Sequence, residues 1–176
     1  MTVNEIAFLK SLLQPDNVML EWGCGGSTLE YSKYVKEYYS IEHSKIWADK
    51  ISQQATANTH IFHIEPEFAH SGFDPAKRGQ FTSYVNFPLT LNKDFDIIII
   101  DGRDRLNCSK VAKQLLKSDG LLLLHDFFPS RMPRYGKIVK DYEPIVQVGS
   151  LAVFVHRIPR KHNDIYIPTV KLSKKI

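Results

Sequence analysis

The chain has 176 residues, of which 43% are hydrophobic and 24% charged, as is ordinary for one globular domain. No apolar run approaches the ~20 residues of a membrane span, and the first residues lack the pattern of a signal peptide. Two cysteines do not make the framework of a disulfide-rich protein, so we expect reduced thiols and a cytoplasmic location.

The net charge of +4 is concentrated at one end of the chain. Residues 157–176 carry six Lys or Arg and one Asp, whereas the preceding 156 residues carry 17 basic and 18 acidic residues. We therefore expect a domain over residues 1–156 and a basic tail over residues 157–176. Because enzymes that act on nucleic acid usually carry a basic face on the fold itself, we expect no nucleic-acid partner.

Apolar spacing and capping residues predict alternating helices and strands in the first third of the chain. Thr2 and Glu5 fit a capping box at the start of a helix that Pro15 ends. Strands are predicted at residues 17–21, 38–42 and 60–64, and helices at residues 27–36 and 44–54.

The later part of the chain contains two unbroken apolar strands. Residues 65–94 combine glycines, prolines and aromatic residues without a clear period, and no element is assigned to them; loops of this length are usually functional. Buried strands are predicted at 95–101 and 121–126, with a helix at 109–117 and a turn at Asp119-Gly120 between them. A short helix at 135–140 and a hairpin of 145–148 and 151–156, turning at Gly149-Ser150, complete the domain.

This alternation predicts an α/β fold with a doubly wound, mostly parallel seven-stranded sheet and a C-terminal antiparallel hairpin. Sheets of this kind bind ligands beyond the carboxyl ends of their strands. Acids and other polar residues gather at those ends, at Glu21, Glu42-His43, Glu65, Asp101–Arg103 and His125-Asp126. The sequence therefore places the site along this edge.

The stretch EWGCGGST, residues 21–28, is the strongest functional signal. The dinucleotide fingerprint G-x-G-x-x-G would need glycine where the chain has Thr28. An acid, Glu21, leads the glycines, and Glu42 follows 21 residues later, where a carboxylate can accept hydrogen bonds from ribose hydroxyls. This pattern favours a cationic nucleoside without phosphate, S-adenosylmethionine (SAM), over the simpler interpretation of a tight turn with Ser27 as N-cap.

LEWGCGGST followed by SIEH resembles motif I and the next acidic motif of the class I SAM-dependent methyltransferases, over about residues 17–156. The resemblance implies a Rossmann-like methyltransferase fold, with Glu65 at the adenine amino group. His43 and Trp47 are expected to flank the adenine ring, with a place in the hydrophobic core as the alternative for Trp47. The SAM-binding residues that it implies are Glu21, Gly23, Cys24, Gly25, Ser27, Thr28, Glu42, His43, Glu65 and Asp101. A narrower resemblance, to a branch with the pattern D-G-R-x-R…C…H-D…R…Y, rests on Asp101–Arg105, Cys108, His125-Asp126, Arg131 or Arg134, and Tyr135.

Asp101 and His125-Asp126 end strands expected to be neighbours, and two catalytic schemes use them. In the first, His125 is a metal-free general base that Asp101 or Asp126 orients. In the second, Asp101 and Asp126 bind Mg²⁺ or Mn²⁺. This arrangement resembles the metal-dependent catechol and macrolide-sugar O-methyltransferases, which place acids at these strand ends. The positive charge of Arg103 and Arg105 favours the first scheme. A purely structural role for His125 and Asp126 is the third interpretation.

Arg103 is expected both in catalysis and at the acceptor, unless it only pairs with a neighbouring acid. Arg131, Arg134 and Tyr135 are the other candidates for binding a polar small-molecule or glycan acceptor. Resemblance to sugar-modifying O-methyltransferases favours a sugar or glycan hydroxyl. The alternatives are a nicotinamide-dependent enzyme, which the missing third glycine and the missing Tyr-x-x-x-Lys pair argue against, and a non-catalytic module that binds SAM.

Overall fold

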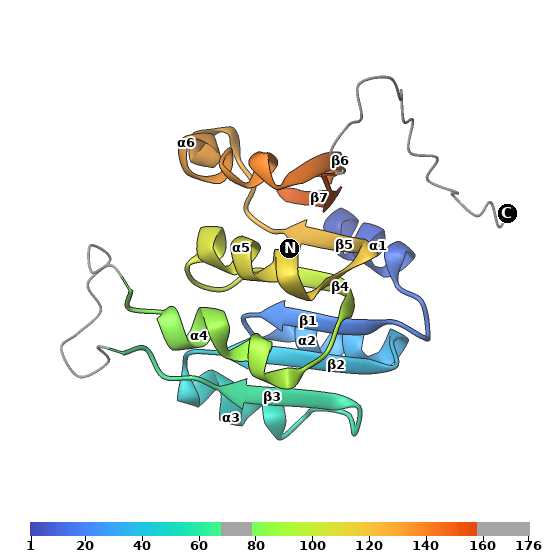
Figure 1. The fold of residues 1–176 in the computed structure, drawn as a ribbon. Helices are drawn as coiled ribbons and strands as arrows, with labels where there is room; N and C mark the ends of the chain where they lie inside the picture. The colour runs from blue at the N-terminus through green and yellow to red at the C-terminus, as the bar shows by residue number, and fades with distance from the viewer. Residues whose placement is uncertain (68–78, 158–176) are drawn as a thin grey trace, which may run out of the picture.

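Seven strands form the central sheet of the computed structural model, which describes residues 1–67 and 79–157 (Figure 1). The strands are β1 (Val18–Trp22), β2 (Glu37–Glu42), β3 (Thr59–His63), β4 (Phe95–Ile100), β5 (Leu116–Leu124), β6 (Tyr142–Val148) and β7 (Leu151–His156). Their order is β3-β2-β1-β4-β5-β7-β6. Neighbours among β1 to β5 are parallel, and β7 is antiparallel to both β5 and β6. The predicted fold class is therefore confirmed.

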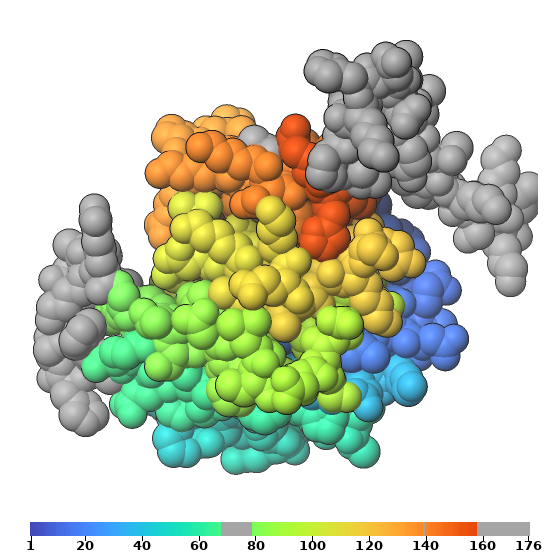
Figure 2. Space-filling model, viewed as in Figure 1, coloured from blue at the N-terminus to red at the C-terminus, as the bar shows by residue number. Residues whose placement is uncertain are grey.

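Helices cover both faces of the sheet. They are α1 (Val3–Leu12), α2 (Gly26–Tyr31), α3 (Lys45–Ser52), α4 (Thr82–Asn86), α5 (Arg105–Leu115) and α6 (Met132–Tyr135), with 3-10 turns η1 (Ser32–Tyr34), η3 (Phe87–Leu91), η4 (Pro129–Arg131) and η5 (Ile138–Lys140). Because successive strand residues point to opposite faces, the sheet carries two cores. Leu20 and Ile98 pack in the core under α4 and α5, on the side seen in Figure 2, and Met19 packs with α1 in the other.

The elements after β4 differ from the prediction in several places. The short helix predicted at 135–140 is wrong: α6 ends at Tyr135, and the 3-10 turn η5 follows at Ile138–Lys140. The helix predicted at 109–117 begins earlier, because Asp104 adopts a left-handed conformation (φ 44°) and its carbonyl accepts the amides of Asn107 and Cys108. The predicted turn at Asp119-Gly120 is an irregularity inside β5. The register with β4 passes there from Phe95 opposite Leu116 to Ile97 opposite Leu121.

Two predicted segments fall partly outside the described residues. The unassigned stretch 65–94 contains α4 and η3 after residue 79, while residues 68–78 are not described. The basic tail lies almost entirely in the undescribed residues 158–176 and stays a prediction. None of the helices in the described part of the chain has the length and hydrophobicity that a membrane crossing requires.

Candidate active site

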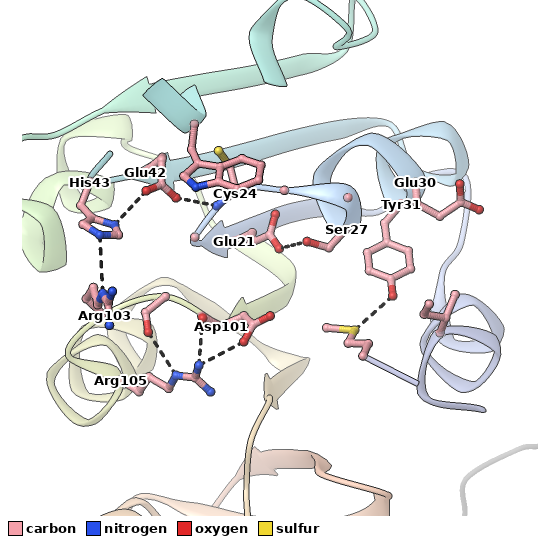
Figure 3. A pocket seen from close by; sticks show the side chains of 17 residues that line it. Glu21, Cys24, Ser27, Glu30, Tyr31, Glu42, His43, Asp101, Arg103 and Arg105 are labelled. Carbon is pink, nitrogen blue, oxygen red and sulfur yellow. Dashed lines mark hydrogen bonds and ion pairs between the residues drawn. The ribbon is translucent and has the colours of Figure 1, made fainter. Parts of the chain in front are cut away.

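A cavity of about 610 Å³ opens where β1, β2 and β4 end (Figure 3). Its volume lies within the range of small-molecule sites, roughly 300–1,000 Å³. The structure brings nine predicted site residues to its wall: Glu21, Gly23, Cys24, Gly25, Ser27, Glu42, His43, Asp101 and Arg103. The carboxyl edge of the sheet therefore carries the cavity, at the place where the polar strand ends indicated a site.

Glycine occupies the positions between β1 and α2 for different physical reasons. Gly23 has φ +104°, and a Cβ built on it would lie 3.1 Å from the Gly102 nitrogen. Position 23 therefore requires glycine, both for its backbone conformation and for the close approach of the loop after β4. At Gly25 and Gly26 a Cβ would meet no atom within 4 Å, so their missing side chains leave open space in the cavity that they line. Burial raises the pKa of the neighbouring Cys24 thiol, which keeps it protonated near neutral pH.

The first turn of α2 is built around Glu21. Gly25, not Ser27, is the N-cap, so the predicted cap is wrong. Ser27 lies within the helix and donates its hydroxyl to Glu21 Oε1 at 2.5 Å. The hydroxyls of Thr28 and Tyr38 donate to Glu21 Oε2 at 2.6 and 3.0 Å. Thr28 is fully buried and does not line the cavity, so it supports Glu21 instead of contacting a ligand directly.

Glu21 is 1% exposed and still forms part of the cavity wall. Burial raises its pKa to about 7 against the three hydroxyl hydrogen bonds, and the negative charge of Asp101 adds to the rise. Its ionised form is therefore sensitive to any positive charge placed in the cavity.

Glu42 ends β2 and fixes the glycine loop. Its Oε2 accepts the Cys24 amide at 2.8 Å, its Oε1 accepts the Ser44 amide at 2.7 Å, and His43 Nδ1 lies 2.8 Å from Oε1. Burial alone would raise the pKa of Glu42, but these hydrogen bonds outweigh it and the pKa is lowered. A carboxylate has about four acceptor positions, so one remains for a ligand.

The outer wall consists of His43, Trp47 and Arg103. Arg103 is exposed and donates from Nε to His43 Nε2 at 3.5 Å, which assigns the ring proton to Nδ1; this buried nitrogen lies close to Glu42 Oε1 but is not aligned for a hydrogen bond. Trp47 is 49% exposed and lines the cavity, which corrects the alternative that it belongs to the core. Glu65 is exposed two residues after β3 and is not among the described residues that line the cavity.

Seven lining residues were not among the predicted site residues: Met1, Ile6, Gly26, Glu30, Tyr31, Gly102 and Arg105. Helical spacing could have found two of them, because Glu30 and Tyr31 lie three and four positions after Ser27 on one face of α2. The packing of α1 brings Met1 and Ile6 to the cavity wall, and no local sequence pattern predicts this position. Tyr31 contacts the Met1 sulfur through its hydroxyl at 3.2 Å.

The ends of β4 and β5 meet, as predicted, in a cluster of Asp101, His125 and Asp126. One potential ligand atom from each lies within 4.8 Å of the others. Arg105, the first residue of α5, lies between the acids, with Nη2 at 3.1 Å from both Asp101 Oδ1 and Asp126 Oδ2. The side chain of Arg105 is 11% exposed and those of Asp101 and Asp126 are 29% and 28% exposed, so these ion pairs are partly shielded from water.

His125 has carboxylates next to both ring nitrogens. Its Nδ1 lies 3.0 Å from Asp101 Oδ1, and its Nε2 lies 3.5 Å from Glu5 Oε2. The hydrogen bond to Asp101 raises the pKa of His125, against burial and with help from the charge of Asp126. His125 does not line the cavity, whereas Asp101 does. The geometry therefore gives His125 a role in orienting Asp101.

The predicted acceptor residues after β5 lie apart from the cavity wall. Arg131 Nη1 is 3.3 Å from Asp126 Oδ2 and 3.5 Å from the Tyr135 hydroxyl. Arg134 is exposed, 4.0 Å from Asp104. Tyr135 is 5% exposed and stacks on Phe127, which leaves it little surface for the predicted contact with an acceptor.

Comparison with known proteins identifies the fold. No protein-family model and no curated protein matches the sequence. A methyltransferase-like protein of Silicibacter pomeroyi is similar in structure, with a TM-score of 0.70 and 22% identity over 92% of this chain and 90% of that one. A TehB-like SAM-dependent methyltransferase of Corynebacterium glutamicum has a TM-score of 0.57 and 16% identity, over 89% of each chain. An rRNA methylase of Streptococcus thermophilus has a TM-score of 0.58 and 10% identity, over 86% and 93%. At these identities the likeness shows the methyltransferase fold.

Proposed function

We propose that the protein is a SAM-dependent methyltransferase, and the observation that carries this proposal is the acidic cavity beside Glu42. Four acids, Glu21, Glu30, Glu42 and Asp101, and two arginines line it. An excess of carboxylates attracts a sulfonium and an ammonium group and repels a diphosphate.

The amides of the glycine loop argue against a nicotinamide dinucleotide in the same cavity. Phosphate sites use free backbone N–H groups at a helix N-terminus. Here the Cys24 amide is bonded to Glu42 and the Gly25 amide to Thr28 Oγ1 at 3.0 Å. The loop is therefore organised by its own carboxylate and hydroxyl, which suits a ligand without phosphate.

The lining residues fit the parts of SAM one by one. Glu42 has an acceptor position for a ribose hydroxyl, and His43 and Trp47 offer ring faces for an adenine. Glu21 and Asp101 supply negative potential for the cationic end. When bound, SAM would supply an electrophilic methyl group: the acceptor atom would bond to the methyl carbon in line with sulfur, and adenosylhomocysteine would leave.

In this proposal Asp101 receives the proton of the acceptor, and His125 is a positioning residue. Asp101 lines the cavity, and its bonds from Arg105 and His125 both fall on Oδ1. We assign Oδ2 to the acceptor hydroxyl. His125 keeps its proton on Nδ1 toward Asp101 and holds that carboxylate at the cavity, which replaces its predicted role as the base.

The acceptor in this proposal is a sugar or glycan hydroxyl, so the reaction is O-methylation. Arg103, on the wall, supplies hydrogen-bond donors suited to a polyhydroxylated molecule, and the exposed Arg131 and Arg134, which lie apart from the wall, would meet only the outer part of an extended glycan. The fold also occurs in an rRNA methylase, so RNA is the comparison acceptor in the test.

The experiment measures transfer of a labelled methyl group from SAM to a sugar and glycan panel and to rRNA. Asp101→Asn should lower the transfer rate by roughly 10²–10⁴-fold with little change in adenosylhomocysteine affinity, as expected for loss of a general base. Asp119→Asn, an exposed acid within β5, is the matched control and should keep the wild-type rate. Labelling of rRNA alone would replace the glycan acceptor, and binding without transfer to any acceptor would favour a non-catalytic module.

A further inference from the structure

The cluster at the ends of β4 and β5 has the ligands of a divalent cation site, but a guanidinium group occupies its centre. Asp101, His125 and Asp126 offer two carboxylates and an imidazole within 4.8 Å of one another. Such a set suits Mg²⁺ or Mn²⁺ only when the carboxylate oxygens face the ion. Here one oxygen of each carboxylate lies 3.1 Å from Arg105 Nη2.

Arg105 uses the whole of its planar fork at this position. Nε donates to the Gly102 carbonyl at 3.1 Å, Nη1 to the His125 carbonyl, and Nη2 to the Asp101 carbonyl at 2.9 Å as well as to both carboxylates. These acceptors belong to the chain just after β4 and just after β5. One side chain therefore joins two neighbouring strand ends, as a bound metal ion would by collecting ligands from both.

A cation and the guanidinium cannot share the cluster. An ion that reached Asp101 and Asp126 would stand against the positive charge of Arg105, and like charges repel strongly at such short range in a partly shielded cluster. Turning Arg105 away would also break its hydrogen bonds to the carbonyls of Gly102, Asp101 and His125. A metal therefore does not fit the chain as it is, and no catalytic step is assigned to one.

We propose that Arg105 takes the place of a divalent metal ion: it offsets part of the negative charge of Asp101 and Asp126, fixes the two strand ends, and excludes Mg²⁺ and Mn²⁺ from the cluster. Arg105 is in this account a positioning residue. The proposal goes beyond the methyltransferase function and does not depend on it, because the cluster can be tested without SAM or an acceptor. It also makes a specific prediction, since removal of the guanidinium should leave three protein ligands for a cation.

The test is direct Mn²⁺ binding to the full chain, followed by the electron paramagnetic resonance signal of free Mn²⁺. The wild type should show no saturable binding, and excess chelator should leave its Tm unchanged. Arg105→Ala should bind one Mn²⁺ per chain at least tenfold more tightly than the wild type, with a rise in Tm on adding Mn²⁺. Arg105→Ala combined with Asp126→Asn should lose this gain.

Two controls keep the result interpretable. Lys110→Ala removes an exposed positive charge from the same helix and should gain no Mn²⁺ site, and Arg105→Lys, which keeps a charge, should gain none either. Arg105→Gln repeats the test with a polar side chain should the alanine variant fail to fold. Wild-type Mn²⁺ binding that Asp126→Asn abolishes would overturn the proposal, and so would folded Arg105 variants lacking the guanidinium that bind no more Mn²⁺ than the wild type.

Discussion

Glu21 and Glu42 leave the same edge of the sheet on neighbouring strands, yet their surroundings shift their pKa values in opposite directions. Burial raises the pKa of Glu21 to about 7, because its partners are three neutral hydroxyls. Glu42 is also buried, but His43 and two backbone amides lower its pKa. One site therefore holds a permanent carboxylate and a second one whose charge responds to pH and to ligand.

Glu42→Gln should weaken adenosylhomocysteine binding by roughly 10–100-fold. The change removes a charge and one acceptor oxygen, and a hydrogen bond to a charged group contributes about 1.5–3 kcal/mol. Quenching of the half-exposed Trp47 in the cavity wall offers the readout. Glu37→Gln, at the other end of β2, is the matched control and should bind like the wild type. Equal affinity of all three proteins would remove Glu42 from the ligand site.

Glu21 should make the protein less stable as pH rises from about 4.5 to about 7. Over this range Glu21 of the unfolded chain releases a proton that folded Glu21 retains. The contribution of Glu21 to the free energy of unfolding is therefore complete below pH 4.5 and disappears as the pH rises through 7; it amounts to about 3 kcal/mol at most. Urea unfolding of the wild type and Glu21→Gln at several pH values measures it, and the difference between the two proteins separates Glu21 from His125. If the free energies of unfolding of the wild type and of Glu21→Gln changed in parallel with pH, the raised pKa assigned to Glu21 would be contradicted.

At the scale of elements, one carboxylate, that of Glu5, connects α1 to the turn between β6 and β7. Glu5 accepts the Thr2 amide at 2.6 Å, closing the predicted capping box, and also the amide and hydroxyl of Ser150 in the β6–β7 turn. A Cβ on Gly149 would lie 2.6 Å from Glu5 Oε1, and Gly149 has φ +58°, so this turn requires glycine twice over. Through this contact Met1 and Ile6 reach the cavity.

Glu5→Gln should lower the free energy of unfolding by roughly 1–3 kcal/mol near neutral pH, since it disturbs hydrogen bonds of a buried carboxylate. Burial opposes ionisation of Glu5, but the bonds from Thr2 and Ser150 lower its pKa to about 2. Its contribution is therefore present above about 4.5 and lost as pH falls toward 2. Unfolding at pH 3 and pH 6 should show a smaller difference between variant and wild type at pH 3. Asp16→Asn, an exposed acid after α1, should show none at either pH.

Local patterns predicted the elements well where one physical cause dominated. The apolar runs at 95–101 and 121–126 became buried strands because helices cover both faces of the sheet, and Thr2 with Glu5 formed the expected cap. The start of α5 was missed because residues 101–105 contain no apolar residue, so a helix begun by a left-handed Asp104 has no periodic signal.

The site was predictable to the extent that strand ends define it. Parallel strands bring Glu21, Glu42 and Asp101 to one edge, so their proximity follows from the strand order. The bonds of Arg105 and the burial of Tyr135 did not follow, because they depend on the packing of α5 and of the chain after β5. Similarly, nothing local distinguished a His125 that faces the cavity from one held between Asp101 and Glu5.

At the scale of the whole molecule, the strand order places the cavity where the chain reverses direction across the sheet. β2 and β4 lie on either side of β1, so the loops after these three strands open toward one another at the switch point where such folds bind ligands (Figure 1). Solved methyltransferase structures share the architecture. The acids on the cavity wall, and not the fold, are what favour SAM over a phosphate-bearing nucleotide.

Isothermal titration calorimetry with adenosylhomocysteine and with NADH tests this central claim most directly, because it needs neither an acceptor nor an assumed catalytic residue. We predict saturable binding of one adenosylhomocysteine per chain, competition by SAM, and no heat of binding for NADH under the same conditions. Binding of NADH, or the absence of any binding by adenosylhomocysteine and SAM to the folded protein, would contradict the assignment of the cavity.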